Sequence, residues 1–274
     1  MSNKAVIVDG VRSPIGTKGS PMIGMRSDEI AGQVIRGLLD RNKKLDVNLI
    51  EDVSLGCAFP EGPTGMLVAR GASILAGIPE TAAANVINRY CGSAMTSLHM
   101  ISSAIEAGDI EVGIAGGVED MFTIPQGGFA PDFNVKLAEQ DYYISMGEGA
   151  ELLADELDIS REEQEDFSFS SHDKAVAASE AGKFDNEIVP ITLEDGTIIN
   201  KDSGPRTPDK DKIKSLNPAF RADGTVTAAT SSPFSIGASA MLITSEKFAK
   251  EHGLKIRAST VSYTHLTLPT SYAV

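Results

Sequence analysis

The apolar and polar positions in the first part of the chain alternate between two periods. Short apolar runs such as AVIVDG at residues 5–10 are typical of buried strands. The segment SDEIAGQVIRGLLDRNKKL, residues 27–45, places Ile30, Val34 and Leu38 at helical spacing after a polar start. Strand and helix in regular alternation indicate a mostly parallel sheet covered by helices, so we expect an α/β fold.

The same periodicity predicts the next elements in order. They are a strand at 51–59, a helix at 65–76, a strand near 84–88, a helix at 91–107 and a strand at 110–117. The alternating pattern resumes near residue 235, after a segment of different composition. It predicts a strand at 235–245, a helix at 245–253 and a strand at 255–262.

Between these two parts the composition changes. Stretches rich in Pro, Gly and Asp flank two charged helices, expected at 146–158 and 160–182. The second helix opens with Ser160 followed by Glu163, the pattern of a capping box. We therefore expect residues 121–236 to form a helical insertion with long loops, placed on the α/β core.

Charge and cysteine content narrow the classes of protein that fit. The net charge of −14 opposes nonspecific binding to nucleic acid, because phosphates are repelled. No stretch approaches the ~20 apolar residues of a membrane helix, and no signal peptide is visible, so we expect a soluble cytoplasmic protein. Cys57 and Cys91 are too few for a disulfide framework. Cys57 lies within an apolar strand, which favours a structural role.

Cys91 lies between a predicted strand and a predicted helix. After it, Met95, Leu98, Ile101 and Ile105 recur at helical spacing, so the cysteine stands at or beside the start of that helix. Backbone N–H groups at a helix start stabilise a thiolate and can hold an oxyanion, and the small residues that follow leave room for a substrate. Free cysteines are also often buried and inert, so position alone leaves both roles open.

A longer motif surrounds this cysteine. The stretch NRYCGSAMTSLHMISSAIEAGDIEVGIAGGVEDM, residues 88–121, resembles the active-site segment of the thiolases. Further matches follow in the order of the family: VIVDGVRSPIG, RGASILAGIP, ISREEQEDFSFSSHDKA, NEIVPI, LNPAF, GTVTAATSS and GASAMLITSEKFAKEHGLK. The chain is thereby identified as a member of the thiolase family over residues 4 to about 260.

The resemblance implies a thiolase fold, layered α/β/α/β/α, in which two similar halves pack together and a loop domain covers acyl-CoA. On that pattern residues 1–120 and 237–262 form the N-terminal core, and 121–236 form the loop domain. The second half is then missing from this chain. Residues 263–274 match nothing in the family, and we expect them to be a non-native tail.

The same resemblance implies the site. Cys91 matches the nucleophile that takes an acyl group from 3-ketoacyl-CoA and passes it to CoA, so CoA is a substrate and neither a bound cofactor nor a metal is implied. Arg206, Phe220, Ser232 and Met146 match positions that contact the CoA ester.

Because the protein is acidic, phosphate binding requires a local group of cations. The loop PRTPDKDKIKSLNPAFR offers five: Arg206, Lys210, Lys212, Lys214 and Arg221. A solvated loop balanced by Asp209 and Asp211 is the simpler interpretation for each lysine taken singly.

Two catalytic motifs of the family do not occur in this sequence. They are a Gly-His-Pro, whose His activates the nucleophile, and a Cys-x-Gly, whose Cys moves the α-proton of the substrate. None of His99, His172, His252 and His265 is followed by Pro, and the neighbours of His265 do not match. We therefore expect this chain by itself to be inactive.

The motifs are most similar to degradative 3-ketoacyl-CoA thiolases of fatty-acid β-oxidation. Biosynthetic acetyl-CoA acetyltransferases (acetoacetyl-CoA thiolases) are the second possibility, because loop shape rather than a short motif sets substrate length. A noncatalytic fragment that binds CoA esters is the third, and a ketosynthase is disfavoured by the context of the nucleophile. The resemblance also implies a homodimer or tetramer, with a hydratase/dehydrogenase subunit as a further partner.

Overall fold

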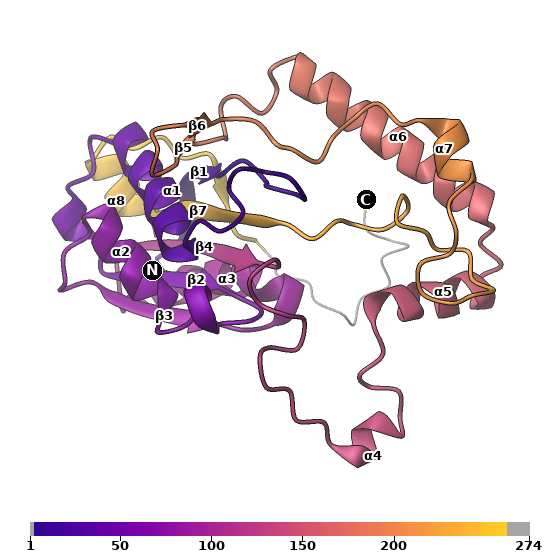
Figure 1. Cartoon of the computed structure of the whole chain (residues 1–274). Coiled ribbons are helices and arrows are strands. Elements are labelled where there is room, and N and C mark those ends of the chain that lie inside the picture. The colour runs from indigo at the N-terminus through magenta and orange to yellow at the C-terminus, as the bar shows by residue number, and fades with distance from the viewer. Residues whose placement is uncertain (1–2, 262–274) are drawn as a thin grey trace.

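The core of the computed structural model, which describes residues 3–261, is a six-stranded sheet with the order β3-β2-β4-β7-β1-β8 (Figure 1). Its strands are β1 (Ala5–Arg12), β2 (Asp52–Gly56), β3 (Ala83–Ile87), β4 (Val112–Asp120), β7 (Ile236–Ser245) and β8 (Ala258–Ser259). β2 runs parallel to both β3 and β4, whereas β7 runs antiparallel to β4 and β1. The expected α/β class is confirmed, but the prediction of a mostly parallel sheet is wrong: β7 and β8 run against the other strands, so the pairs β4–β7, β7–β1 and β1–β8 are antiparallel.

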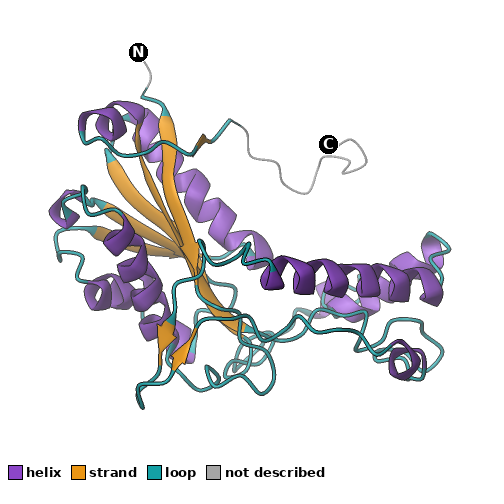
Figure 2. Ribbon diagram, turned by 90° about the horizontal axis from the view of Figure 1, so that it is seen from above, coloured by secondary structure: helices purple, strands orange, loops and turns teal. Residues whose placement is uncertain are grey.

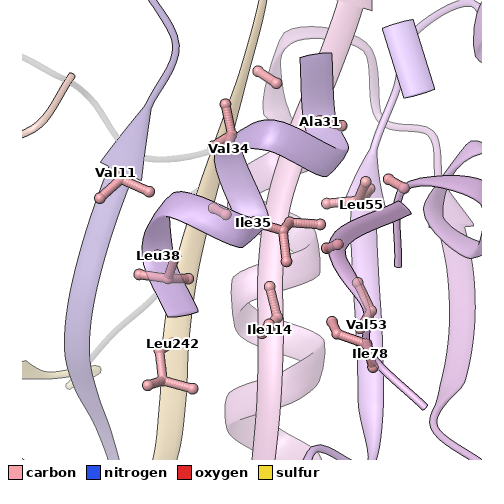
Figure 3. Packing of buried hydrophobic residues seen from close by; sticks show 14 of the residues in the cluster. Val11, Ala31, Val34, Ile35, Leu38, Val53, Leu55, Ile78, Ile114 and Leu242 are labelled. Carbon is pink, nitrogen blue, oxygen red and sulfur yellow. The ribbon is translucent and has the colours of Figure 1, made fainter. Parts of the chain in front are cut away.

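Helices cover both faces of this sheet (Figure 2). They are α1 (Ser27–Arg41), α2 (Val68–Ala76), α3 (Ser93–Ala107) and α8 (Glu246–Glu251). Buried residues of α1, α2 and α8 share one apolar cluster with the sheet, and buried residues of α3 share a second. Figure 3 shows Ile35 and Leu38 of α1 directed towards Ile114 and Leu242 on the sheet. Full burial of one such side chain contributes about 1.5–3 kcal/mol, so this layer anchors the fold.

α1 and α2 depart from their predicted bounds, and in each case the cause is local. α1 ends at Arg41 because the Asn42 side chain donates to the carbonyl of Leu38 at 2.8 Å and closes the last turn. α2 begins at Val68 because Met66 and Leu67 have φ angles of 49° and 59°, in the left-handed region. Apolar spacing alone reports neither effect.

Residues 121–236, which we call the insertion, lie between β4 and β7. They contain α4 (Val135–Ala138), α5 (Met146–Glu156), α6 (Arg161–Glu180), the short hairpin β5 (Ile191–Thr192) and β6 (Ile198–Ile199), and α7 (Lys210–Lys214). Figure 1 shows α5, α6 and α7 set apart from the sheet. The predicted capping box of Ser160 and Glu163 at the start of α6 is confirmed. Within residues 3–261 no helix is long and apolar enough to cross a membrane.

Part of the insertion returns to the sheet. Arg12 on β1 forms ion pairs with Glu187 and Asp202, both at 2.7 Å, and Ile191 is fully buried in the core cluster. The division into a core of residues 1–120 and 237–262 and a loop domain of 121–236 stays a prediction. The proposed tail at 263–274 lies outside the described residues.

The ion pair between Arg12 and Asp202 leads to a pH-dependent prediction. Burial alone would raise the pKa of Asp202, but hydrogen bonds from Arg12 and from the Ile15 N–H, with the charge of Arg12, lower that pKa overall. A depressed carboxyl pKa stabilises the fold above the unfolded value of about 3.9, and the contribution is lost as the pH falls through the folded value. We expect Asp202→Asn to cost about 2 kcal/mol at neutral pH.

Thermal unfolding of the wild type and Asp202→Asn between pH 7 and 2.5 checks this expectation. The difference in Tm should be widest at neutral pH and should close below about pH 4. A difference that stays constant across this range would contradict the assigned role of the carboxylate.

Candidate active site

Cys91 is exposed, in a single 3-10 turn, Tyr90–Gly92, between β3 and α3. The prediction that the helix begins at Cys91 is wrong by two residues, because α3 begins at Ser93. The turn is irregular since Tyr90 has a φ of 46°, a conformation that is costly for a residue with a side chain. Strain of this kind persists where the surrounding contacts fix it, and it is frequent at functional sites.

Side chains on both sides of the turn hold it in place. The Ser93 hydroxyl accepts from the Arg89 N–H at 2.8 Å and donates to the Tyr90 carbonyl at 2.5 Å. Asn88 accepts from the Tyr90 N–H at 2.9 Å and donates to the Ala58 carbonyl at 2.8 Å. The turn that carries Cys91 is therefore fixed to α3 on one side and to the segment after β2 on the other.

Glycines at the end of β2 and within β4 let the start of α3 approach the sheet. A Cβ on Gly56 would lie 2.3 Å from the Ala94 nitrogen and 2.6 Å from the Ser93 Cβ. A Cβ on Gly117 would lie 2.9 Å from the Ala94 Cβ. Both distances are shorter than those of real Cβ contacts. Glycine at these two positions therefore lets the start of α3, and the turn that carries Cys91 before it, lie close to the sheet.

The backbone donors nearest to Cys91 are partly used within the turn itself. The Gly92 N–H donates to the Arg89 carbonyl at 3.0 Å, and the Ser93 N–H donates to the Tyr90 carbonyl. These two N–H groups therefore donate within the turn. Fewer backbone N–H groups than the sequence predicts are left to hold an oxyanion. Cys91 stands two residues before the first residue of α3, at the end of the helix where its dipole is positive.

Cys57 has a different environment. Its side chain is buried at the end of β2, and its Sγ lies 3.5 Å from Oε1 of Glu119. Burial, with the nearby charge of Glu119, raises the pKa of Cys57 to about 12. A thiol of this kind stays protonated and unreactive at neutral pH, which agrees with a structural role.

Two of the predicted CoA contacts lie together at the start of α5. Met146 is the first residue of that helix, and its side chain is 81% exposed. The Phe220 ring covers the next residue, because a Cβ on Gly147 would lie 2.2 Å from that ring. Phe220 and Met146 therefore form an exposed apolar surface at the helix start.

The other two predicted contacts lie elsewhere in the insertion. The Arg206 side chain is exposed, and its backbone N–H lies 3.5 Å from Nδ1 of His172 on α6. Ser232 is exposed in the segment that leads into β7. Among the hydrogen bonds and ion pairs of residues 3–261, none joins Cys91 to Arg206 or Ser232.

The expected group of cations is smaller than the sequence indicates. Arg221 forms ion pairs with Asp155 at 2.8 Å, with Glu148 at 3.6 Å and with Glu151 at 3.7 Å. The hydrogen bond to Asp155 raises the pKa of Arg221. Arg221 is therefore neutralised by carboxylates of α5, and its charge holds the loop on that helix.

The lysines of the same loop form α7, where the Asp209 side chain caps the helix by accepting from the Lys212 N–H at 3.1 Å. Lys210 lies with its Nζ 5.1 Å from the centre of the Phe169 ring. Among the histidines, His99 lies on α3 and His252 stacks on Phe248 with ring centres 3.9 Å apart. His265 lies outside the described residues.

Comparison with known proteins shows the family to which the chain belongs. Residues 5–247 match the family model described as thiolase, N-terminal domain. The chain belongs to the thiolase family. Its described fold is therefore a thiolase N-terminal domain, a mixed α/β unit of an acyltransferase.

Individual thiolases show how far the similarity extends. A 3-ketoacyl-CoA thiolase of Photobacterium profundum is 43% identical over 266 residues, which cover 93% of this chain and 68% of the relative. A 3-oxoadipyl-CoA/3-oxo-5,6-dehydrosuberyl-CoA thiolase of Escherichia coli is 38% identical and covers 94% of this chain and 70% of the relative. The crystal structure of the Bacillus anthracis acetyl-CoA acetyltransferase matches with a TM-score of 0.82 and 33% identity, over 93% of this chain and 68% of that one.

The residues that support the turn of Cys91 were not predicted from the sequence. Glu119 accepts from the Ala58 N–H at 2.6 Å and the Phe59 N–H at 3.3 Å, and Asn88 connects the same segment to the turn. One available signal was the glycine in each strand pattern, Gly56 in β2 and Gly117 in β4, because glycine inside a strand pattern marks close approach by another backbone. The carboxylate contacts have no comparable local signal.

Proposed function

We propose that this chain carries the nucleophile of a thiolase that transfers an acyl group from 3-ketoacyl-CoA to CoA through a thioester on Cys91. In that reaction the Cys91 thiolate attacks the 3-keto carbonyl, and the bond between C2 and C3 breaks. The electron pair leaves with acetyl-CoA, which takes up a proton at C2. The CoA thiolate then takes the acyl group and releases Cys91.

One observation carries this proposal: an exposed cysteine on a strained turn at the start of α3, in a chain of the thiolase family. The degradative direction is supported by 43% identity to a relative named as a 3-ketoacyl-CoA thiolase. The biosynthetic alternative is supported by the structural match to an acetyl-CoA acetyltransferase at 33% identity. Fatty-acid β-oxidation and a hydratase/dehydrogenase partner belong to the degradative form of the proposal, whereas a cytoplasmic location and homo-oligomeric assembly belong to both forms.

The proposal also includes the expected inactivity of this chain alone. The 274 residues contain neither the Gly-His-Pro nor the Cys-x-Gly motif that supplies the base and the proton carrier of the family. A thiolate at a helix start can still react with an electrophile that needs neither group. Under this proposal the chain forms a covalent adduct on Cys91 but does not turn over.

Bromoacetyl-CoA separates these two properties, because the thiolate displaces bromide directly. We expect alkylation of Cys91, measured by peptide mass spectrometry, to saturate with bromoacetyl-CoA and to be slowed by free CoA. Cys91→Ala should abolish it and Cys57→Ala should not. Labelling that neither saturates nor responds to CoA would contradict a CoA-ester site and leave only a reactive thiol.

Turnover is measured in parallel with acetoacetyl-CoA and with 3-ketooctanoyl-CoA. We expect neither substrate to release acetyl-CoA with the 274-residue chain. Release from either would overturn the expected inactivity.

A further inference from the structure

Asn88 bridges two segments that meet beside the nucleophile. Its side-chain oxygen accepts from the Tyr90 N–H at 2.9 Å, and its side-chain nitrogen donates to the Ala58 carbonyl at 2.8 Å. We propose that Asn88 is a positioning residue for Cys91. Glu119 fixes the position of residues 57–59, and Asn88 links these residues to the turn that carries Cys91. This inference rests on the proposed role of Cys91.

Glu119 forms the rigid end of this connection. One carboxylate oxygen accepts from the Ala58 N–H at 2.6 Å, and the other lies 3.3 Å from the Phe59 nitrogen and 3.5 Å from the Cys57 sulfur. Hydrogen bonds to an ionised acceptor are shorter and stronger than neutral ones. The carbonyl of Ala58 is consequently held at a fixed place above the end of β4.

Further contacts fix the same segment from the other side. The Thr64 hydroxyl donates to the Phe59 carbonyl at 2.6 Å. The Phe59 ring meets the Tyr90 ring edge-on, with centres 6.0 Å apart and planes at 63°. The segment after β2 therefore touches the nucleophile turn twice, once through the amide of Asn88 and once through the Tyr90 ring.

The position of Cys91 depends on the conformation of the residue before it. Tyr90 has a φ of 46°. A non-glycine residue keeps such a φ only where contacts with its surroundings enforce it. Asn88 is the side chain that holds the Tyr90 N–H. Without that bond the turn can relax to a negative φ, and Cys91 moves away from the positive end of α3.

The test is the rate of alkylation of Cys91 by iodoacetamide from pH 6 to 9, followed by mass spectrometry of its peptide. We expect Asn88→Ala to lower the rate at neutral pH about tenfold, as for a misplaced reacting group. Asn88→Asp keeps the acceptor for the Tyr90 N–H but loses the donor to Ala58. It should fall between Asn88→Ala and the wild type.

Glu119→Gln tests the far end of the bridge. It replaces one of the acceptor oxygens by an amide donor that opposes a backbone N–H, so we expect a smaller fall in the alkylation rate of Cys91 than with Asn88→Ala. Asn48→Ala is the matched control. Asn48 is exposed in the 3-10 turn Val47–Leu49, bonds only locally to Asp46, and should leave the rate unchanged.

Cys57 reports on folding in the same Asn88 experiment, because its buried thiol is alkylated only if the local fold opens. If Asn88→Ala exposes Cys57, the comparison of Asn88→Asp with the wild type decides: a slower rate supports the proposal and an equal rate overturns it. An Asn88→Ala protein that is folded and reacts at the wild-type rate also overturns it. Iodoacetamide carries no CoA, so such a result is independent of the bromoacetyl-CoA test of function.

Discussion

Replacing Gly56 by alanine is expected to lower the free energy of unfolding by about 3 kcal/mol and to slow the alkylation of Cys91. The added Cβ would lie 2.3 Å from backbone atoms of Ser93 and Ala94, and backbone cannot yield as a flexible side chain can. The start of α3 must therefore lift away from β2 and carry Cys91 with it. Urea unfolding gives the stability change, and peptide mass spectrometry gives the rate.

Gly71→Ala is the matched control for this substitution. Gly71 lies inside α2, and its added Cβ would meet Asp28 at an ordinary distance of 3.6 Å. Alanine is the better helix former, so we expect a gain of up to about 1 kcal/mol and unchanged reactivity of Cys91. If Gly56→Ala were as harmless as Gly71→Ala, close packing of α3 on β2 would not set the position of the cysteine.

Glu151→Ala is expected to destabilise the insertion by about 3 kcal/mol, because it leaves two backbone N–H donors without their acceptor and removes one of the three carboxylates around Arg221. Glu151 is 1% exposed and accepts from the N–H groups of Thr225 and Val226 at 2.9 and 3.0 Å, while Arg221 lies 3.7 Å away. Its loss should release the loop that carries Phe220 from α5. Limited trypsin digestion then cuts after Arg221 faster than in the wild type.

Glu156→Ala on the same helix is the control, since Glu156 is exposed and its removal should change stability by less than about 0.5 kcal/mol. Glu151→Gln should lie between the two, because it keeps the shape but loses the charge. Equal trypsin sensitivity of Glu151→Ala and Glu156→Ala would show that the carboxylate does not hold the loop.

The sequence predicts the order of the core elements because each has a strong period, but it predicts their ends less well. β4 continues to Asp120, beyond the predicted end at residue 117, because it pairs with β7 as far as Ile236. That pairing is a contact between distant segments, so no local pattern reports it. α7 and the β5–β6 hairpin were not predicted, since they are too short for a periodic signal.

The site divides in the same way. The prediction that Cys91 is the nucleophile rests on its motif and on its place before a helix, both of which are local. The support of its turn depends on Ala58 and Glu119, which meet Asn88 only in the fold. Arg221 shows the reverse case: its charge is visible in the sequence, but the carboxylates of α5 that neutralise it are not adjacent to it in the chain.

The place of the insertion also determines the order in which the sheet can be completed. β1 is made first, yet its partners β7 and β8 both follow residue 235, and β4 meets β7 only after the whole insertion has been synthesised. Contacts between such distant segments form slowly, and unpaired strand edges favour aggregation until those contacts have formed. A nascent chain released before Ser245 would therefore leave β1 and one edge of β4 unpaired, and unpaired strands of this kind favour aggregation.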